Sequence, residues 1–169
     1  MSLFAAAVYK RRLTDLSGDE LRAMGVKALL LDVDNTLTPH DDPHVSPEVQ
    51  RWLDDRKAEG FSLTVVSNNR AERVAPFARG IGLPFTARAK KPLPWGFWRA
   101  ADSLGLPRRE CLVIGDQIFT DIAGANLAGM RSVQLLPIEP EKHQPFIRFK
   151  RWLERPILAH NLRKRGICL

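Results

Sequence analysis

Apolar residues occur along this chain in short runs, separated by longer stretches that begin and end with helix signals. Runs of about four to eight apolar residues are the length of buried strands, and five are present, at residues 26–33, 61–66, 84–87, 110–114 and 131–136. Helix signals precede or separate them. Ser17-Gly18-Asp19-Glu20 is a capping box before Gly25, Ser46-Pro47-Glu48 joins an N-cap to an N-terminal proline, and Pro94 can open a helix. The predicted helices cover residues 18–24, 46–60, 70–79, 94–104 and 118–128.

Strands that alternate with helices at this spacing predict one fold class. We expect an α/β protein with a three-layer, Rossmann-like, open parallel sheet of five strands joined by right-handed crossovers. Three parts of the chain are predicted: an N-terminal docking segment and short helix (1–25), the main α/β domain (26–140), and a C-terminal tail (141–169).

The positive charge is concentrated in that tail. The chain has a net charge of +7, and residues 141–169 hold eight Lys or Arg against two Asp or Glu. At helical spacing, one face of the tail carries Phe146, Phe149, Leu153 and Ile157, and the opposite face carries Arg148, Arg151 and Arg155. We expect Pro156 to break or kink this helix. Two interpretations stay open: the helix lies on an anionic membrane, or its apolar face packs on the domain with the arginines solvated.

Further features of the sequence concern the location and the partners of the protein. No run approaches the ~20 apolar residues of a membrane span, the N-terminus lacks the pattern of a signal peptide, and the two cysteines form no disulfide framework. A cytoplasmic location follows as an expectation, with peripheral attachment to the inner membrane face as an option. No nucleic-acid motif is present, so no nucleic-acid partner is expected; the oligomeric state stays open.

Polar residues follow the predicted strands, where open parallel sheets bind ligands. Asp32, Asp34 and Thr36 end the first strand, Ser67 and Asn68 the second, and Asp116 the fourth; Lys91 follows the third. A carboxylate such as Asp32 can attack a phosphate monoester and form an acyl phosphate, while Asp34 serves as general acid and then as general base. Clustered carboxylates require a hard cation, and Mg²⁺ prefers oxygen ligands. Each of these features alone is common in turns and helix caps; their joint order predicts a phosphatase site.

The order of these motifs resembles the haloacid dehalogenase (HAD) superfamily of phosphatases, subclass IIIA. Its D-x-D-x-T loop, Ser/Thr, Lys and G-D-x-x-x-x-D stretch correspond to 32–36, Ser67, Lys91-Pro92 and 115–121. The resemblance implies that Asp32 is the nucleophile and a metal ligand, and that Asp34 is the acid/base whose backbone carbonyl binds the metal. It further implies that Ser67 and Asn68 hold the phosphoryl oxygens, Lys91 neutralises charge, and Asp116 binds Mg²⁺ with Asp121 and Thr36 in support. Lys90 competes with Lys91 for its role.

The segments between the motifs are too short for the cap domains that many superfamily members carry. Residues 37–60 and 70–90 can each hold only a helix and short connections, so we expect a capless enzyme with an open site. More narrowly, the chain resembles the phosphatidylglycerophosphate phosphatase family, which implies removal of the terminal phosphate of that lipid. The alternatives are a phosphatase for a soluble phosphosugar, nucleotide or phosphoprotein, and a non-catalytic protein that binds anions or membranes.

Overall fold

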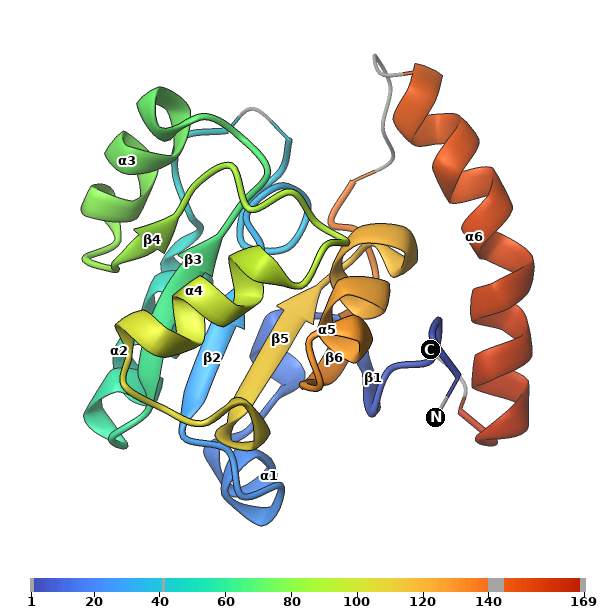
Figure 1. The fold of residues 1–169 in the computed structure, drawn as a ribbon, viewed down its shortest axis with the longest axis horizontal. Helices are drawn as coiled ribbons and strands as arrows, with labels where there is room; N and C mark the ends of the chain where they lie inside the picture. The colour runs from blue at the N-terminus through green and yellow to red at the C-terminus, as the bar shows by residue number, and fades with distance from the viewer. Residues whose placement is uncertain (1, 41, 140–144, 168–169) are drawn as a thin grey trace.

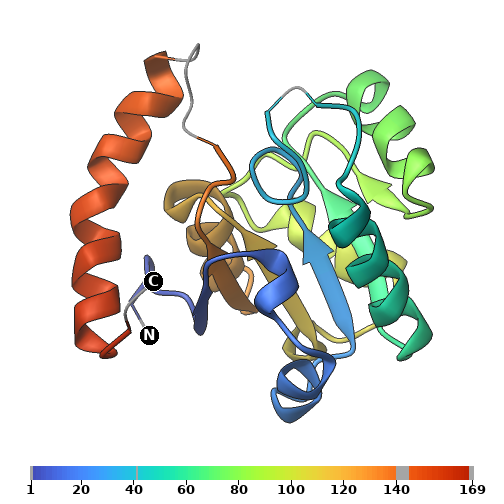
Figure 2. The same cartoon turned by 180° about the vertical axis from the view of Figure 1, so that it is seen from behind.

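The computed structural model describes residues 2–40, 42–139 and 145–167. Its centre is a sheet of six parallel strands in the order β1-β6-β5-β2-β3-β4, shown from two sides in Figures 1 and 2. The strands are β1 (Val8–Lys10), β2 (Ala28–Leu31), β3 (Ser62–Val66), β4 (Phe85–Thr86), β5 (Cys111–Gly115) and β6 (Arg131–Leu135). The predicted α/β class and parallel sheet are confirmed.

The predicted number of strands is wrong by one. Strand β1 lies in the segment that we expected to be a docking piece, and it extends the sheet by pairing in parallel with β6, with Val8 opposite Val133 and Lys10 opposite Leu135. Three residues are too few to show a strand periodicity, and Val8-Tyr9-Lys10 is followed by charged residues rather than a turn signal. The formation of strand β1 at the edge of the sheet therefore depends on its pairing with β6 and not on a local sequence pattern.

The helices begin and end near the predicted residues. They are α1 (Gly18–Ala23), α2 (Pro47–Ala58), α3 (Ala71–Gly80), α4 (Trp95–Ser103), α5 (Ala123–Leu127) and α6 (Pro145–Lys164), with a π-helical turn η3 (Ile118–Ile122) leading into α5. The side chain of Ser17 accepts a hydrogen bond from the Glu20 backbone N–H and so caps α1, and Ser46 caps α2 in the same way through Val49. Short 3₁₀ turns lie at Leu13–Asp15 and Arg108–Glu110.

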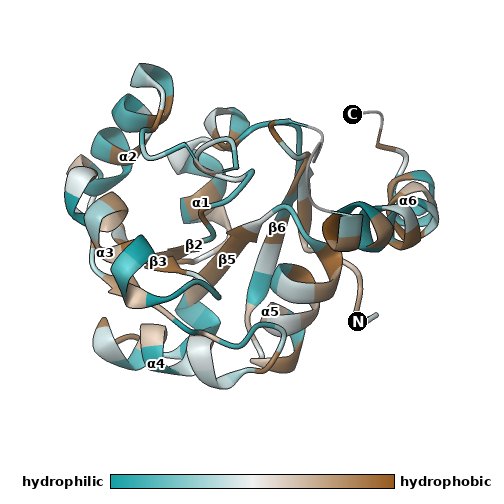
Figure 3. Cartoon of the chain, turned by 90° about the horizontal axis from the view of Figure 1, so that it is seen from above, coloured by the Kyte–Doolittle hydropathy of each residue, from teal (hydrophilic) through white to brown (hydrophobic). Residues whose placement is uncertain are grey.

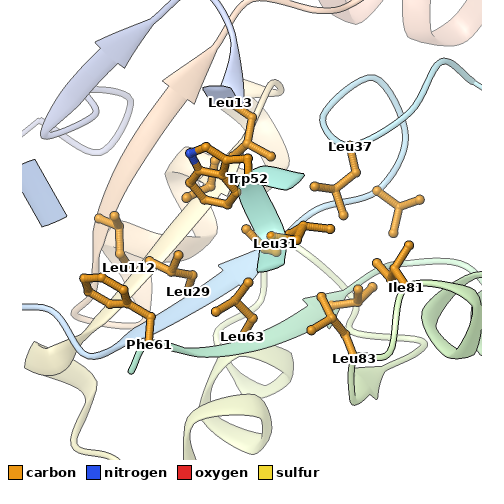
Figure 4. Close-up of a cluster of buried hydrophobic side chains, with 14 of the residues drawn as sticks. Leu13, Leu29, Leu31, Leu37, Trp52, Phe61, Leu63, Ile81, Leu83 and Leu112 are labelled. Atoms are coloured by element: carbon orange, nitrogen blue, oxygen red, sulfur yellow. The ribbon is translucent and has the colours of Figure 1, made fainter. Parts of the chain in front are cut away.

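The four inner strands, β2, β3, β5 and β6, bury both faces, whereas the edge strands β1 and β4 are partly exposed. Alternate residues of β2 point to opposite sides, so Leu29 and Leu31 join the core with α2 and α3, whereas Ala28 and Leu30 join the core with α4 and α5. Figure 4 shows the first of these cores, in which Trp52 of α2 belongs to the same cluster as Leu31 and Leu112 of the strands. Viewed from above, the hydrophobic strands lie between layers of helices (Figure 3). This packing holds the carboxyl ends of the strands in fixed positions.

Helix α6 stands against the edge of the sheet (Figures 1 and 3). A small cluster joins Ala6, Tyr9 and Ile122 to Leu158 and Leu162 of the helix. We expected Pro156 to break or kink this segment, but Pro145–Lys164 is recorded as one helix with Pro156 inside it. The predicted break is therefore absent: Pro156 removes one backbone donor, and the helix continues past it with contacts to the domain on both sides, at Glu154 and Asn161.

None of the helices in the described residues is long and apolar enough to cross a membrane.

Candidate active site

Three carboxylates meet at the carboxyl end of the sheet. Asp32 directly follows β2, and Asp116 and Asp121 come from the segment after β5, the strand that pairs with β2. One oxygen from each lies within 4.8 Å of the others, and all three residues are buried. Hard oxygen donors gathered in this way fit a divalent cation. The carboxylate of Asp34, which we predicted to contribute through its backbone, lies outside this cluster.

Lys91 is the cation at the centre of the cluster. Its Nζ donates to Asp32 Oδ1 at 2.5 Å and to Asp121 Oδ1 at 2.7 Å, and the residue is only 8% exposed. Lys90, which competed for this role in the sequence, is exposed and has a positive φ of 56°. The structure thus places Lys91, and not Lys90, between the carboxylates.

Burial sets the protonation behaviour of this pair. It raises the pKa of Asp32 to about 8, against the opposing effect of Lys91 and with further help from the charges of Asp121 and Asp116. Burial alone would lower the pKa of Lys91, but the charges and hydrogen bonds of Asp121 and Asp32 outweigh it and raise the pKa. These shifts favour the protonated form of Lys91 and, until further positive charge is added, the protonated form of Asp32.

Asp121 and Thr36 both make hydrogen bonds to other residues of the cluster. Asp121 accepts from the Gln117 backbone N–H (3.1 Å) through its second oxygen, so both of its oxygens are held. The Thr36 hydroxyl donates to Asp116 Oδ1 at 3.3 Å. Gly115 makes room for them, because a Cβ at that position would lie 2.4 Å from Asp121 Cγ.

Asp34 faces a separate cavity of about 280 Å³ beside the cluster. The cavity is lined by residues that include Asp34, Ser67, Asn69 and Arg73. Asn69 Nδ2 donates to Asp34 Oδ2 at 2.8 Å, and Arg73 Nη2 donates to Oδ1 at 3.1 Å. His40 Nδ1 lies 3.5 Å from the same oxygen. The contacts of Asn69, Arg73 and His40 were missed in the sequence, which offers no signal for them beyond the position of Asn69 after β3.

The two predicted phosphate-binding residues behave differently. Ser67 is buried at the end of β3 and its hydroxyl accepts from the Asn69 backbone N–H (3.1 Å). The Asn68 side chain makes two hydrogen bonds to the backbone of Lys91. Its Oδ1 accepts from Lys91 N at 2.7 Å, and its Nδ2 donates to Lys91 O at 3.1 Å. Asn68 therefore positions the lysine segment, and any contact between Asn68 and a phosphoryl group falls to its backbone.

Helix α6 reaches the cluster through Arg151. Its Nη2 pairs with Asp116 Oδ2, and Nη1 donates to the Asp116 carbonyl at 2.7 Å and to Glu154 Oε2 at 3.3 Å. Glu154 in turn accepts from the Phe119 N–H (2.9 Å), and burial raises its pKa. We expected Arg151 on a face of free arginines; it lies instead on the face of α6 that packs against the domain.

On the predicted apolar face of α6, Phe146, Phe149 and Leu153 are exposed and only Ile157 is half-buried, which contradicts the interpretation in which that face packs on the domain. Phe146 is 73% and Trp152 is 62% exposed, and the rings of Phe149 and Trp152 stack with centroids 6.1 Å apart. A groove of about 1010 Å³ runs between α6 and the sheet edge. Its lining includes Asp116, Leu135, Arg148, Phe149, Trp152 and Arg155. The groove therefore joins a mixed basic and aromatic surface to the carboxylate cluster.

A parallel sheet with paired carboxylates, a buried lysine and a buried serine at its carboxyl edge defines a hydrolase suited to phosphoryl groups. A family model for HAD-hydrolase-like proteins matches residues 88–136. A probable phosphatase of Bacillus subtilis, YqeG, is 35% identical over 157 residues, which are 92% of this chain and 90% of that protein. The chain belongs to the HAD superfamily, and it is a phosphatase.

Other similarities are more distant. The chloroplastic phosphatidylglycerophosphate phosphatase 1 of Chlamydomonas reinhardtii is 29% identical over 127 residues, 70% of this chain and 47% of that protein. An uncharacterised protein from Listeria monocytogenes serotype 4b has the same fold, with a TM-score of 0.57 at 19% identity over 71% of this chain and 85% of that one.

Proposed function

We propose that this phosphatase depends on Mg²⁺, uses Asp32 as its nucleophile, and removes the terminal phosphate of phosphatidylglycerophosphate. The observation that carries the catalytic part is the cluster of Asp32, Asp116 and Asp121 around Lys91 at the carboxyl end of the sheet. Bound Mg²⁺ would be held by Asp32, Asp116 and the backbone carbonyl of Asp34, and would neutralise the charge of the phosphoryl oxygens.

The chain's own residues supply the chemistry in two steps. In the first, an Asp32 carboxylate oxygen bonds to phosphorus while the bond to the ester oxygen breaks, and protonated Asp34 gives its proton to that leaving oxygen. In the second, Asp34 takes a proton from water, whose oxygen attacks the aspartyl-phosphate. Inorganic phosphate leaves and the Asp32 carboxylate is restored.

The surrounding contacts suit these roles. Lys91 pairs with Asp32 and so reduces the repulsion between the nucleophile and an anionic phosphate. Asn69 and Arg73 hold the Asp34 carboxyl group toward the cavity that Ser67 also lines. The Ser67 hydroxyl and the backbone N–H of Asn68 are proposed to bind the phosphoryl oxygens.

The lipid substrate is supported by the C-terminal helix. The exposed side chains of Phe146, Phe149 and Trp152 lie on the same helix as exposed Arg148 and Arg155. Aromatic and basic side chains together bind the boundary of an anionic membrane. The groove lined by Phe149, Trp152 and the two arginines includes Asp116, so an amphiphilic ester held there would have its polar end near the carboxylates.

One assay tests both parts of this proposal. Phosphate release is measured from phosphatidylglycerophosphate in vesicles and from a panel of soluble phosphosugars, nucleotides and phosphopeptides, with Mg²⁺ and with EDTA. We expect release with Mg²⁺ only, strongest from the lipid, and none from Asp32→Asn. Release that is equal in EDTA would contradict the metal requirement, and stronger release from a soluble ester would replace the lipid as substrate.

A further inference from the structure

Asp116 already has a cation at its carboxylate. The guanidinium of Arg151 pairs with Oδ2 and also donates to the backbone carbonyl of the same residue, while Thr36 donates to Oδ1. The Asp116 side chain is fully buried and that of Arg151 is 15% exposed, so solvent screens this pair weakly. Both oxygens of a proposed metal ligand are thus engaged within the protein.

A charge count shows why this contact exists. When all three are ionised, Asp32, Asp116 and Asp121 bring three negative charges into a buried space, and Lys91 supplies one positive charge. Arg151 adds a second, and it arrives from a helix about 30 residues further along the chain. Buried carboxylates without compensation are strongly unfavourable, so the guanidinium stabilises the cluster when no other cation is present.

A divalent ion and the guanidinium would both bind the negative charge of the Asp116 carboxylate, and two cations beside one carboxylate repel each other. We infer that Arg151 is the internal counter-ion of Asp116, and that a divalent metal must displace its guanidinium from this carboxylate in order to bind. Arg151 is then a positioning residue that lowers the affinity of the site for metal. This inference rests on the proposed metal-binding role of Asp116 and is independent of the substrate.

The displaced guanidinium has another partner within reach. Glu154 Oε2 lies 3.3 Å from Nη1, one helical turn along α6, and borders the same groove as Arg151. Lys150 Nζ also donates to Gln117 Oε1 at 2.8 Å, which fixes this turn of the helix to the segment after β5. Metal binding is therefore expected to loosen the turn of α6 around Arg151 without detaching the helix.

The test is a titration of the purified, metal-free protein with Mn²⁺, followed by electron paramagnetic resonance of the free ion. We expect Arg151→Gln to bind Mn²⁺ at least about fivefold more tightly than wild type, the lower end of ordinary coupling between sites. Arg151→Lys, which keeps the charge, should stay near wild type. Arg163→Gln is the matched control, because Arg163 is exposed on the same helix and lies outside the lining of the groove that contains Asp116, and it should leave the affinity unchanged. Damage to the fold would weaken binding, which is the opposite sign.

A second measurement needs no variant. Hydrogen exchange of the wild-type protein with and without Mn²⁺ should show faster exchange in residues 148–154 when the metal is bound. Unchanged exchange there, or an Arg151→Gln protein with equal or weaker affinity for Mn²⁺, would overturn the inference. If wild type binds Mn²⁺ and releases phosphate while those two results fail, the proposed function stands and this inference falls. A wild-type protein that binds no metal would overturn both.

Discussion

Gly115 and Asp121 approach so closely that no side chain fits between them. A Cβ added at residue 115 would lie 2.4 Å from Asp121 Cγ and 2.6 Å from Oδ2, distances far inside van der Waals contact. Asp121 has little freedom to retreat, because its oxygens are held by Lys91 and by the Gln117 backbone. The glycine of the Gly115-Asp116 pair is therefore required by the close approach of Asp121, the carboxylate five residues after Asp116, more than by a turn.

Gly115→Ala should accordingly displace Asp121 and, through it, Lys91. We expect a loss of about 1–3 kcal/mol in the free energy of unfolding, as for other overpacked cores, and at least a tenfold fall in phosphatase turnover. Urea unfolding and a phosphate-release assay measure the two effects. Gly80→Ala is the control, since a Cβ at Gly80 meets nothing within 4 Å. Normal turnover in a folded Gly115→Ala protein would show that Asp121 tolerates movement.

The adjacent lysines give a sharper contrast. Lys91→Met leaves Asp32 and Asp121 without their shared ammonium, and loss of one partner of a buried ion pair costs about 3–5 kcal/mol. Turnover should fall by at least about a hundredfold, in the range typical for a lost electrostatic contact to the reacting group. Lys90→Met removes only an exposed side chain and should change both quantities little. Equal effects of the two substitutions would contradict the role given to Lys91.

The raised pKa of Asp32 makes the stability of the metal-free protein depend on pH. The folded-state pKa of about 8 lies above the ordinary value of 3.8, so the contribution of Asp32 to stability is present in full below about pH 4 and is lost as the pH rises to about 8. Asp32→Asn removes this loss. In EDTA, its melting temperature should exceed that of wild type, and the difference should grow between pH 5 and pH 8. A difference that is constant over this range would mean that Asp32 does not titrate there.

The exposed arginines of α6 allow a test of the proposed membrane binding without disturbing the cluster. Arg148→Glu with Arg155→Glu should weaken binding to anionic vesicles by at least about tenfold, because each arginine near such a surface contributes about 1 kcal/mol. Arg51→Glu with Arg79→Glu changes the net charge equally on helices α2 and α3, and should have a smaller effect. Vesicle sedimentation compares the pairs. Arg151 is excluded from this design because it contacts Asp116.

The parallel sheet and the gathering of acidic residues at one of its edges could be predicted from the sequence, because both follow from local pattern. Buried parallel strands are continuous apolar runs, and the polar residues just after them must share one edge of the sheet. The contacts between segments could not be predicted in this way. Helical periodicity separates the faces of α6, but it does not show which face packs against the domain. In the structure, Arg151, Glu154 and Leu158 contact the domain, whereas the side chains of Phe149 and Trp152 are exposed.

The position of β1 brings the two ends of the described chain into contact. Asn161 of α6 donates to the Phe4 carbonyl at 2.8 Å, and Arg165 donates to the Ala7 carbonyl at 2.6 Å. The N-terminal segment therefore anchors the last helix through hydrogen bonds. Asn126 holds the same segment through the carbonyls of Leu3 and Ala5. Deletion of residues 2–7 is thus expected to detach a helix more than 140 residues away in sequence. Arg151 would then lose its position beside Asp116.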